Sequence, residues 1–260
     1  MTQGLAGLLM LRPRLGPAVP PRRRRLPCIA RSRDVVAAAA LLWGALGIVA
    51  APLRAQGTVA GTVRILERGA KASKDLTNAI VYLEGDGGTL RAGSALDNAN
   101  VDMKGREFVP HVQIVRAGGS VGYPNKDPFS HNVFSNSALG AFDLGLYRTG
   151  ASRATVFPKA GVYEVYCNIH ARMVNFVIAV NTPWVTRVNA DGTFQIKGVP
   201  AGTYRMHVWH ERASESVQTV TIGGVGVGGM AIALDARTFT AAPHPDKFGK
   251  AYAATRADRY

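Results

Sequence analysis

Val165-Tyr166-Cys167-Asn168-Ile169-His170-Ala171-Arg172-Met173 spaces a cysteine, a histidine and a methionine three residues apart, at the end of a β-branched and aromatic stretch. A second histidine, His131, lies upstream in the run Asp127-Pro128-Phe129-Ser130-His131-Asn132-Val133-Phe134-Ser135. One thiolate, two imidazoles and one thioether are the donors of a trigonal copper site with a weak axial sulfur ligand. The pattern therefore predicts that His131, Cys167, His170 and Met173 bind one copper ion.

The cysteine count supports a ligand role for Cys167. The chain has two cysteines, and Cys28 falls in an N-terminal segment that we expect to be removed. Cys167 is then left without a disulfide partner in the chain, and a free thiol is vulnerable in an oxidising compartment unless it is buried or ligated. A purely structural role as a small buried hydrophobic residue is the alternative. The two histidines and the methionine at matching positions favour the metal.

Two other chemistries that use cysteine and histidine fit less well. Structural zinc sites prefer two or more thiolates, and a thioether is a poor zinc ligand. A thiol hydrolase needs a base that is oriented by a third group. His170 is only three residues from Cys167 on the same loop, and the sequence offers no evident third group. Copper therefore remains the preferred interpretation.

The remaining histidines are not expected to bind this metal. His111 follows Pro110 in a strand-like run and is predicted to pack or to support the site rather than to ligate. His207 and His210 flank Val208-Trp209, and side chains alternate between the faces of a strand, so the two should point to opposite faces. We expect both on the strand surface, without a shared second metal site. His244 carries no prediction.

The N-terminal segment has the order of a secretory signal. Residues 1–34 are rich in Arg and Pro, residues 35–51 are apolar, and small residues precede the polar sequence that begins near residue 56. We therefore expect residues 1–55 to direct export, by the Sec or the Tat route, to the periplasm or beyond the cell. A retained anchor is the alternative, because the apolar run is just long enough to approach a membrane span. Membrane association is expected only in that case.

The charge balance argues against nucleic-acid binding. The whole chain is formally +14, but residues 1–55 hold nine Arg and one Asp, so that the remainder carries +6. No basic run with interleaved aromatic residues follows residue 56. A mildly basic surface could steer an acidic redox partner or an anionic membrane surface, but ordinary solubility is the favoured explanation.

Strand signals recur throughout the exported part, and helical periodicity is nearly absent. Most signals are short β-branched or aromatic runs bounded by Gly, Pro, Asn or Asp, a pattern typical of sandwiches and small barrels. The sequence therefore predicts an all-β protein. The expected strands are 58–66, 79–83, 109–115, 120–123, 132–134, 155–157, 161–167, 174–180, 184–188, 193–196, 202–209, 217–222 and 230–234. The glycine-rich run 223–229 leads into no helix, so we expect a flexible connection there, and residues 241–260 are expected to form a poorly ordered polar tail.

Residues 101–180 resemble a cupredoxin, a blue-copper Greek-key β-sandwich of the plastocyanin and amicyanin kind. The matching pieces are Phe108-Val109-Pro110-His111, Gly118-Gly119-Ser120-Val121, Asn125-Lys126-Asp127, His131-Asn132-Val133-Phe134-Ser135, Gly161-Val162-Tyr163 and the run from Cys167 to Met173. The run from Cys167 to Met173, called the ligand loop below, is short and in this respect closer to amicyanin. It lacks the Pro that amicyanin carries beside its second histidine. The whole chain looks like secreted proteins labelled as methylamine-utilisation proteins. The resemblance implies that His170 presents an edge to solvent, and Phe129, Phe134, Ile169 and Ala171 would then form an apolar rim for a partner.

A second resemblance flanks the first. The run 191–204, with 57–63 and 78–84, looks like a carboxypeptidase-regulatory-like, transthyretin-type sandwich. We therefore expect a discontinuous sandwich, residues 57–90 plus 182–237, with a cupredoxin domain at 98–181 inserted between its strands. Two consecutive domains are the alternative.

The favoured function is that of a periplasmic carrier of single electrons between a donor and an acceptor protein, with one type 1 copper per chain. A copper trafficking or resistance protein is less favoured, because no Met- or His-rich tract is present. A binding module with a non-redox copper site is the third possibility. Copper oxidases and nitrite reductases need further histidine clusters such as His-x-His pairs, and the chain has none. We therefore do not expect an enzyme.

Overall fold

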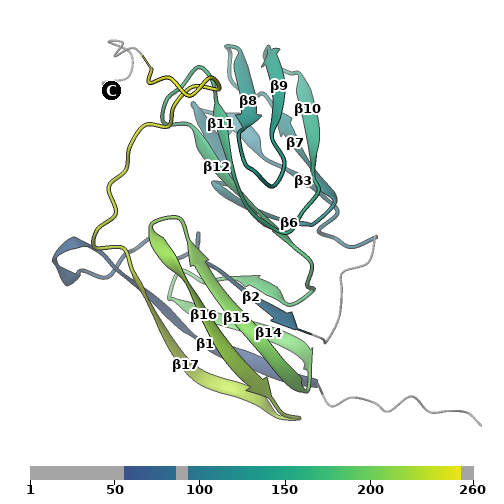
Figure 1. Ribbon diagram of the computed structural model, residues 1–260, viewed down its shortest axis with the longest axis vertical. Coiled ribbons are helices and arrows are strands. Elements are labelled where there is room, and N and C mark those ends of the chain that lie inside the picture. The colour runs from purple at the N-terminus through teal and green to yellow at the C-terminus, as the bar shows by residue number, and fades with distance from the viewer. Residues whose placement is uncertain (1–55, 86–92, 253–260) are drawn as a thin grey trace, which may run out of the picture. The chain divides into compact units, whose positions relative to one another are not determined.

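The computed structural model describes residues 56–85 and 93–252, so that the expected export segment, residues 1–55, lies outside the described part. The described residues form seventeen strands and one short 3-10 turn, with no α-helix among them (Figure 1). The prediction of an all-β fold is confirmed. Within the same residues, no helix has the length and apolarity needed to cross a membrane.

Two sheets are built from both ends of the described chain. One has the order β14-β1-β17 and the other the order β13-β2-β15-β16. The strands are β1 (Gln56–Leu66), β2 (Ile80–Gly85), β13 (Val185–Arg187), β14 (Thr193–Pro200), β15 (Gly202–His210), β16 (Ala213–Ile222) and β17 (Gly226–Asp235). A single buried cluster takes Ile65 from β1, Leu83 from β2, Met206 from β15 and Ile232 from β17. Segments on either side of residues 101–179 therefore enclose one core, while the domain boundaries expected from the sequence stay a prediction.

The intervening residues form a second set of sheets with a core of their own. The sheet orders are β10-β7-β3 and β6-β12-β11-β8-β9, with a small β4-β5 pair. The strands are β3 (Asn98–Asn100), β4 (Asp102–Lys104), β5 (Glu107–Val109), β6 (Val112–Arg116), β7 (Gly119–Pro124), β8 (His131–Ser135), β9 (Phe142–Tyr147), β10 (Ser152–Phe157), β11 (Gly161–Cys167) and β12 (Val174–Val180). Their buried cluster includes Tyr123, Phe157, Tyr163 and, at the edge that concerns function, Cys167 and Met173.

The glycine-rich run is not the flexible connection expected from the sequence. Its second half begins β17, which pairs in parallel with β1 along Thr58–Leu66. A Cβ placed on Gly226, whose φ is +92°, would come within 2.1 Å of the carbonyl oxygen of Thr58. Glycine is therefore required there by the close approach of two strands as well as by the backbone conformation.

The strands that the sequence analysis missed are short or lie at an edge. β3, β4 and β5 have three residues each, and β9 pairs with β8 alone at the end of its sheet. β9 contains Gly145 at a φ of +69° and buries only Tyr147 among exposed and half-buried residues. Three residues are too few to show a repeated alternation, and β9 buries too few side chains to show one, so the strand conformation of these segments depends on their neighbours.

A third cluster lies on the outer faces of strands from both sets of sheets. It consists of Ile80, Tyr82, Val112, Ile178, Val180 and Trp209. Beside it, His111 Nε2 lies 2.8 Å from Glu211 Oε2, and the ring of His111 meets Phe176 edge-on. His111 is thus paired with a carboxylate, and it does not belong to the group formed by His131, Cys167 and His170.

The His111–Glu211 pair predicts a pH-dependent contribution to stability. The hydrogen bond to Glu211 is the main cause that raises the pKa of His111 above its usual 6.5, whereas burial opposes it. Because the folded-state pKa is raised, this contribution is complete below pH 6.5 and declines as the pH rises through the folded-state value. His111→Gln should therefore cost about 1 kcal/mol at pH 6 and less at pH 9, while leaving copper bound. Urea unfolding of both proteins at the two pH values checks this, and an equal cost at both pH values would contradict it.

Candidate metal centre

Antiparallel pairing brings His131 and Cys167 to the same end of one sheet. β8 begins at His131 and β11 ends at Cys167, and the two strands pair with Cys167 opposite Val133. The first residue of one strand therefore lies beside the last residue of its neighbour. The loop that follows Cys167 carries His170 and leads into β12, which pairs with β11 on its other side.

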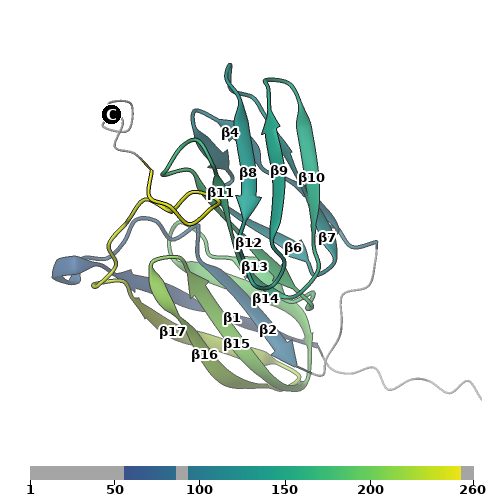
Figure 2. The same ribbon diagram turned by 45° about the horizontal axis from the view of Figure 1, so that its top comes forward.

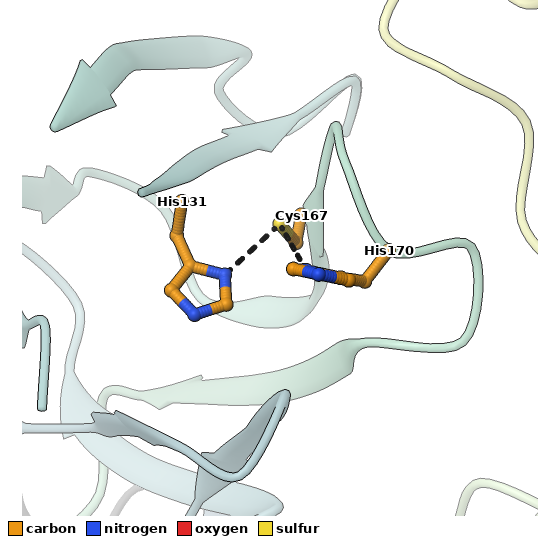
Figure 3. Close-up of side chains that lie close together, drawn as sticks. All are labelled: His131, Cys167 and His170. Carbon is orange, nitrogen blue, oxygen red and sulfur yellow. Dashed lines mark hydrogen bonds between the residues drawn. The ribbon is translucent and has the colours of Figure 1, made fainter. Parts of the chain in front are cut away.

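Two imidazoles converge on one sulfur atom. His131 Nδ1 lies 3.5 Å from Cys167 Sγ, and His170 Nδ1 lies 3.6 Å from the same sulfur (Figure 3). A nitrogen from each ring and the sulfur all fall within 4.8 Å of one another. Cys167 and His131 are fully buried, whereas His170 is half-buried. The arrangement can hold one ion, with His170 nearest to solvent.

Met173, the fourth expected ligand, lies in the same buried cluster as Cys167 and is 2% exposed. Its backbone closes the ligand loop, because its carbonyl oxygen accepts from the N–H of Cys167 and its own N–H donates to the carbonyl of His170. The loop thus places a methionine next to the three convergent residues. Its role as the axial ligand stays a prediction.

Asp127 fixes the orientation of His131, and the sequence analysis did not assign it this role. His131 Nε2 lies 2.9 Å from Asp127 Oδ2, so that its N–H donates there and leaves the Nδ1 lone pair toward Cys167. Burial raises the pKa of Asp127, but the N–H groups of Arg106 and Gly105 and the His131 ring outweigh it, and the net pKa lies below its usual value. The carboxylate of Asp127 is therefore ionised at neutral pH. In the sequence, only its position four residues before His131 could have indicated this pairing.

The thiol of Cys167 is held in its protonated form unless a cation is present. Burial is the main cause that raises its pKa, and the backbone N–H groups of Asn132, Ile169 and His170 offset only part of this effect. A metal ion that binds as a thiolate complex must therefore displace the proton. A buried cysteine sulfur, the Nδ1 atoms of His131 and His170 and a nearby thioether suit copper better than zinc or a hard cation.

The apolar rim is smaller than expected. Phe129 and Ile169 are 36% and 44% exposed, and Phe129 packs near the rings of His131 and His170. Phe134 and Ala171, which we also expected on the rim, are buried. His244 of the C-terminal segment contacts both, through its ring on Phe134 and its N–H on the carbonyl of Ala171.

The two histidines of β15 are buried rather than on the strand surface as expected. His207 stacks on Tyr82 and lies 3.1 Å from Glu215, whereas His210 lies 3.5 Å from Asp75. Each histidine thus has its own carboxylate. Across residues 56–85 and 93–252, His131, Cys167 and His170 form a group of possible metal ligands, and neither His207 nor His210 belongs to such a group.

Comparisons with known proteins give short or distant matches. A family model described as polysaccharide lyase family 4, domain II, matches residues 180–225, and the curated proteins give no match. Among solved structures, a copper-containing nitrite reductase from Thermus scotoductus SA-01 is similar at 24% identity and a TM-score of 0.31, over 36% of this chain and 26% of that one. Amicyanin from Paracoccus versutus is similar at 21% identity and a TM-score of 0.30, over 38% of this chain and 97% of its own. A reduced amicyanin variant is similar at 19% identity and a TM-score of 0.31, over 38% and 98%.

The chain thus spans about a quarter of the nitrite reductase and nearly all of the amicyanins. The regulatory-like resemblance of the flanking sandwich finds no counterpart among these matches. The side chains described above, rather than the matches, carry the proposal that follows.

Proposed function

We propose that this chain is a cupredoxin-like protein that carries single electrons through one type 1 copper bound by His131, Cys167, His170 and Met173. The observation that carries the proposal is the convergence of two Nδ1 atoms on one buried cysteine sulfur, with a buried methionine closing the same loop. Bound copper would supply the one-electron redox couple. An export signal at residues 1–55 would place the protein in the periplasm or outside the cell.

The protein's own residues hold the metal ligands rigidly and keep water away from the cysteine sulfur. Cys167 and His131 belong to hydrogen-bonded strands, and Asp127 holds the His131 ring. Ligands held in this way keep nearly one geometry in both oxidation states, which lowers the reorganisation that accompanies electron transfer. Burial of Cys167 excludes water from the sulfur.

Electrons would enter and leave near His170. It is the more exposed of the two imidazoles, and Phe129 and Ile169 give its surroundings an apolar character. A donor or acceptor protein that docks there would come close to the metal without a ligand moving. In this proposal the protein is a carrier and not an enzyme.

An optical and EPR spectrum of the exported protein loaded with Cu(II) tests the proposal. We expect an intense visible thiolate-to-copper band, a small copper hyperfine splitting and reversible bleaching on reduction. A pale protein with a tetragonal Cu(II) signal would favour copper storage or trafficking instead. Absence of stoichiometric copper would overturn the proposal.

Met173→Leu tests the axial position. Loss of a weak thioether ligand should leave copper bound through the three strong ligands but raise the reduction potential, because the thioether donates electron density that favours Cu(II). The volume change is small, so that we expect a stability cost of less than about 1.5 kcal/mol. Protein-film voltammetry measures the potential. An unchanged potential and spectrum would remove Met173 from the ligand set.

A further inference from the structure

The C-terminal segment returns to the candidate metal centre after the last strand. Figures 1 and 2 show the yellow segment beyond β17 running alongside the loop between β11 and β12. A poorly ordered tail is expected over residues 241–260, but residues up to Tyr252 make specific contacts with the ligand loop. The polar composition of the segment concealed this, because its contacts are hydrogen bonds and a few aromatic rings rather than an apolar stripe.

We propose that His244 and Tyr252 are positioning residues of the metal centre, which clamp the ligand loop into its metal-binding shape before metal arrives. This inference rests on the proposed function, since it assigns a role in that same site. The name C-terminal clamp is used below for residues 244–252.

Four hydrogen bonds join the C-terminal clamp to the ligand loop. The Tyr252 hydroxyl donates to the carbonyl of Cys167 at 3.0 Å, and the backbone N–H of His244 donates to the carbonyl of Ala171 at 3.1 Å. His244 Nε2 lies 3.2 Å from the carbonyl oxygen of His170, and the N–H of Lys247 donates to Asn168 Oδ1 at 2.8 Å. Contacts thus reach both the cysteine and the more exposed histidine ligand.

The ring of His244 is held by aromatic neighbours. It stacks on Tyr166, the residue before Cys167, with ring centroids 4.3 Å apart and planes 24° apart. Tyr252 meets it edge-on at 5.4 Å and Phe134 at 6.2 Å. His244 is 9% exposed. A side chain buried in this way against the end of β11 is a fixed support, not a mobile tail.

An ion pair extends the C-terminal clamp to the strand of the other buried ligand. Lys247 Nζ lies 2.6 Å from Asp143 Oδ2, and Asp143 Oδ1 accepts from the side chain of Asn132 at 2.6 Å. Asn132 follows His131 in β8. The clamp therefore links both ligand-bearing segments, and His244 also contacts Phe134 and Ala171.

The physical consequence is preorganisation. Backbone hydrogen bonds join Cys167 to Met173 and Met173 to His170 within the ligand loop, and another joins Asn168 to Asn132 of β8. The C-terminal clamp adds hydrogen bonds to the backbone carbonyls of Cys167, His170 and Ala171 in the same loop. Tying them down limits motion of His170 relative to the sulfur, and a preformed site loses less entropy on binding. Supporting residues of this kind commonly change metal affinity by about 10–100-fold.

The test compares three variants of the exported protein. His244→Ala removes the ring, Tyr252→Phe removes only the hydroxyl, and Lys250→Ala is the matched control, because that side chain is exposed in the same segment. The first readout needs no metal: hydrogen exchange of the amides from Asn168 to Met173 in the copper-free protein. We expect it to rise about 10-fold in His244→Ala, less in Tyr252→Phe, and not in the control.

The second readout is the rate of copper transfer to an excess of chelator, with the optical spectrum and reduction potential recorded alongside. We expect loss to be about 10-fold faster in His244→Ala, with a shifted visible band but a cooperative unfolding transition like that of the control. A general loss of folding would not shift the band of the folded protein. A variant that lacks residues 241–260 should show at least as large an increase in loop amide exchange and in the rate of copper loss as His244→Ala.

Unchanged loop exchange in both His244→Ala and the truncated protein would overturn the clamp. Changed exchange with unchanged copper loss and spectrum would also overturn it, because the loop would then be supported without effect on the metal. If the unaltered protein bound no copper, the proposed function would fail, and the metal-free exchange data would still decide whether the loop is clamped.

Discussion

Cys167→Ser is expected to abolish the intense visible band and to weaken copper binding by more than about 100-fold. The substitution exchanges a sulfur for a smaller oxygen at a fully buried position and adds no atom, so that the fold should be kept while the donor atom changes. A serine hydroxyl does not ionise near neutral pH, and it cannot supply the covalent, polarisable bond that a thiolate gives to copper. The loss should exceed the 10–100-fold that supporting residues cause, because a ligand itself is removed.

Absorption titration with Cu(II) and EPR measure both effects. Tyr166→Phe is a suitable control, because it alters the neighbouring residue without touching a donor atom, and it should keep the band. Survival of the band in Cys167→Ser would sink the ligand assignment. Loss of folding is checked by far-UV circular dichroism of the metal-free proteins.

Asp127→Asn is expected to lower copper affinity by about 10–100-fold while leaving all four ligands present. The carboxylate accepts from the N–H groups of Gly105 and Arg106 and from His131 Nε2. An amide has one accepting oxygen, so that at least one of these donors would face an NH₂ group. The His131 ring would lose its fixed orientation, and the metal would lose a nearby negative charge.

Competition with a chelator of known affinity gives the copper dissociation constant of this variant. Asp191→Asn is the matched control, since Asp191 is an exposed turn residue that caps Thr193. Because the folded-state pKa of Asp127 is lowered, the stability it contributes is present above its usual value of 3.8 and is lost as the pH falls through the folded-state value. An affinity within about twofold of the unaltered protein would show that His131 needs no carboxylate.

The copper-ligand pattern could be predicted because it is local. Cys167, His170 and Met173 fall within seven positions, on a loop bounded by two strands whose β-branched residues mark them clearly. The distant His131 could be added because a donor set has a known composition. Asp127 was visible in the sequence, but a carboxylate four residues from a histidine is common and indicates a partner only when the turn between them is known.

The C-terminal clamp and the burial of Phe134 could not be predicted in this way. The clamp joins residues more than seventy positions apart, through backbone carbonyls that every sequence contains. Likewise, the glycine-rich run 223–229 predicts a flexible connection by itself, because glycine permits a loop and a close strand pair equally well.

The sequence by itself determined an all-β chain and the residues that offer copper donors, because alternation of side chains and the chemistry of sulfur and imidazole are properties of short segments. Only the tertiary structure decided that two Nδ1 atoms meet one sulfur, that Asp127 orients one ring, and that His244 and Tyr252 hold the loop. Those relations depend on strand register and on which distant segments pack together, and register is set by the burial of whole sheets rather than by any one residue.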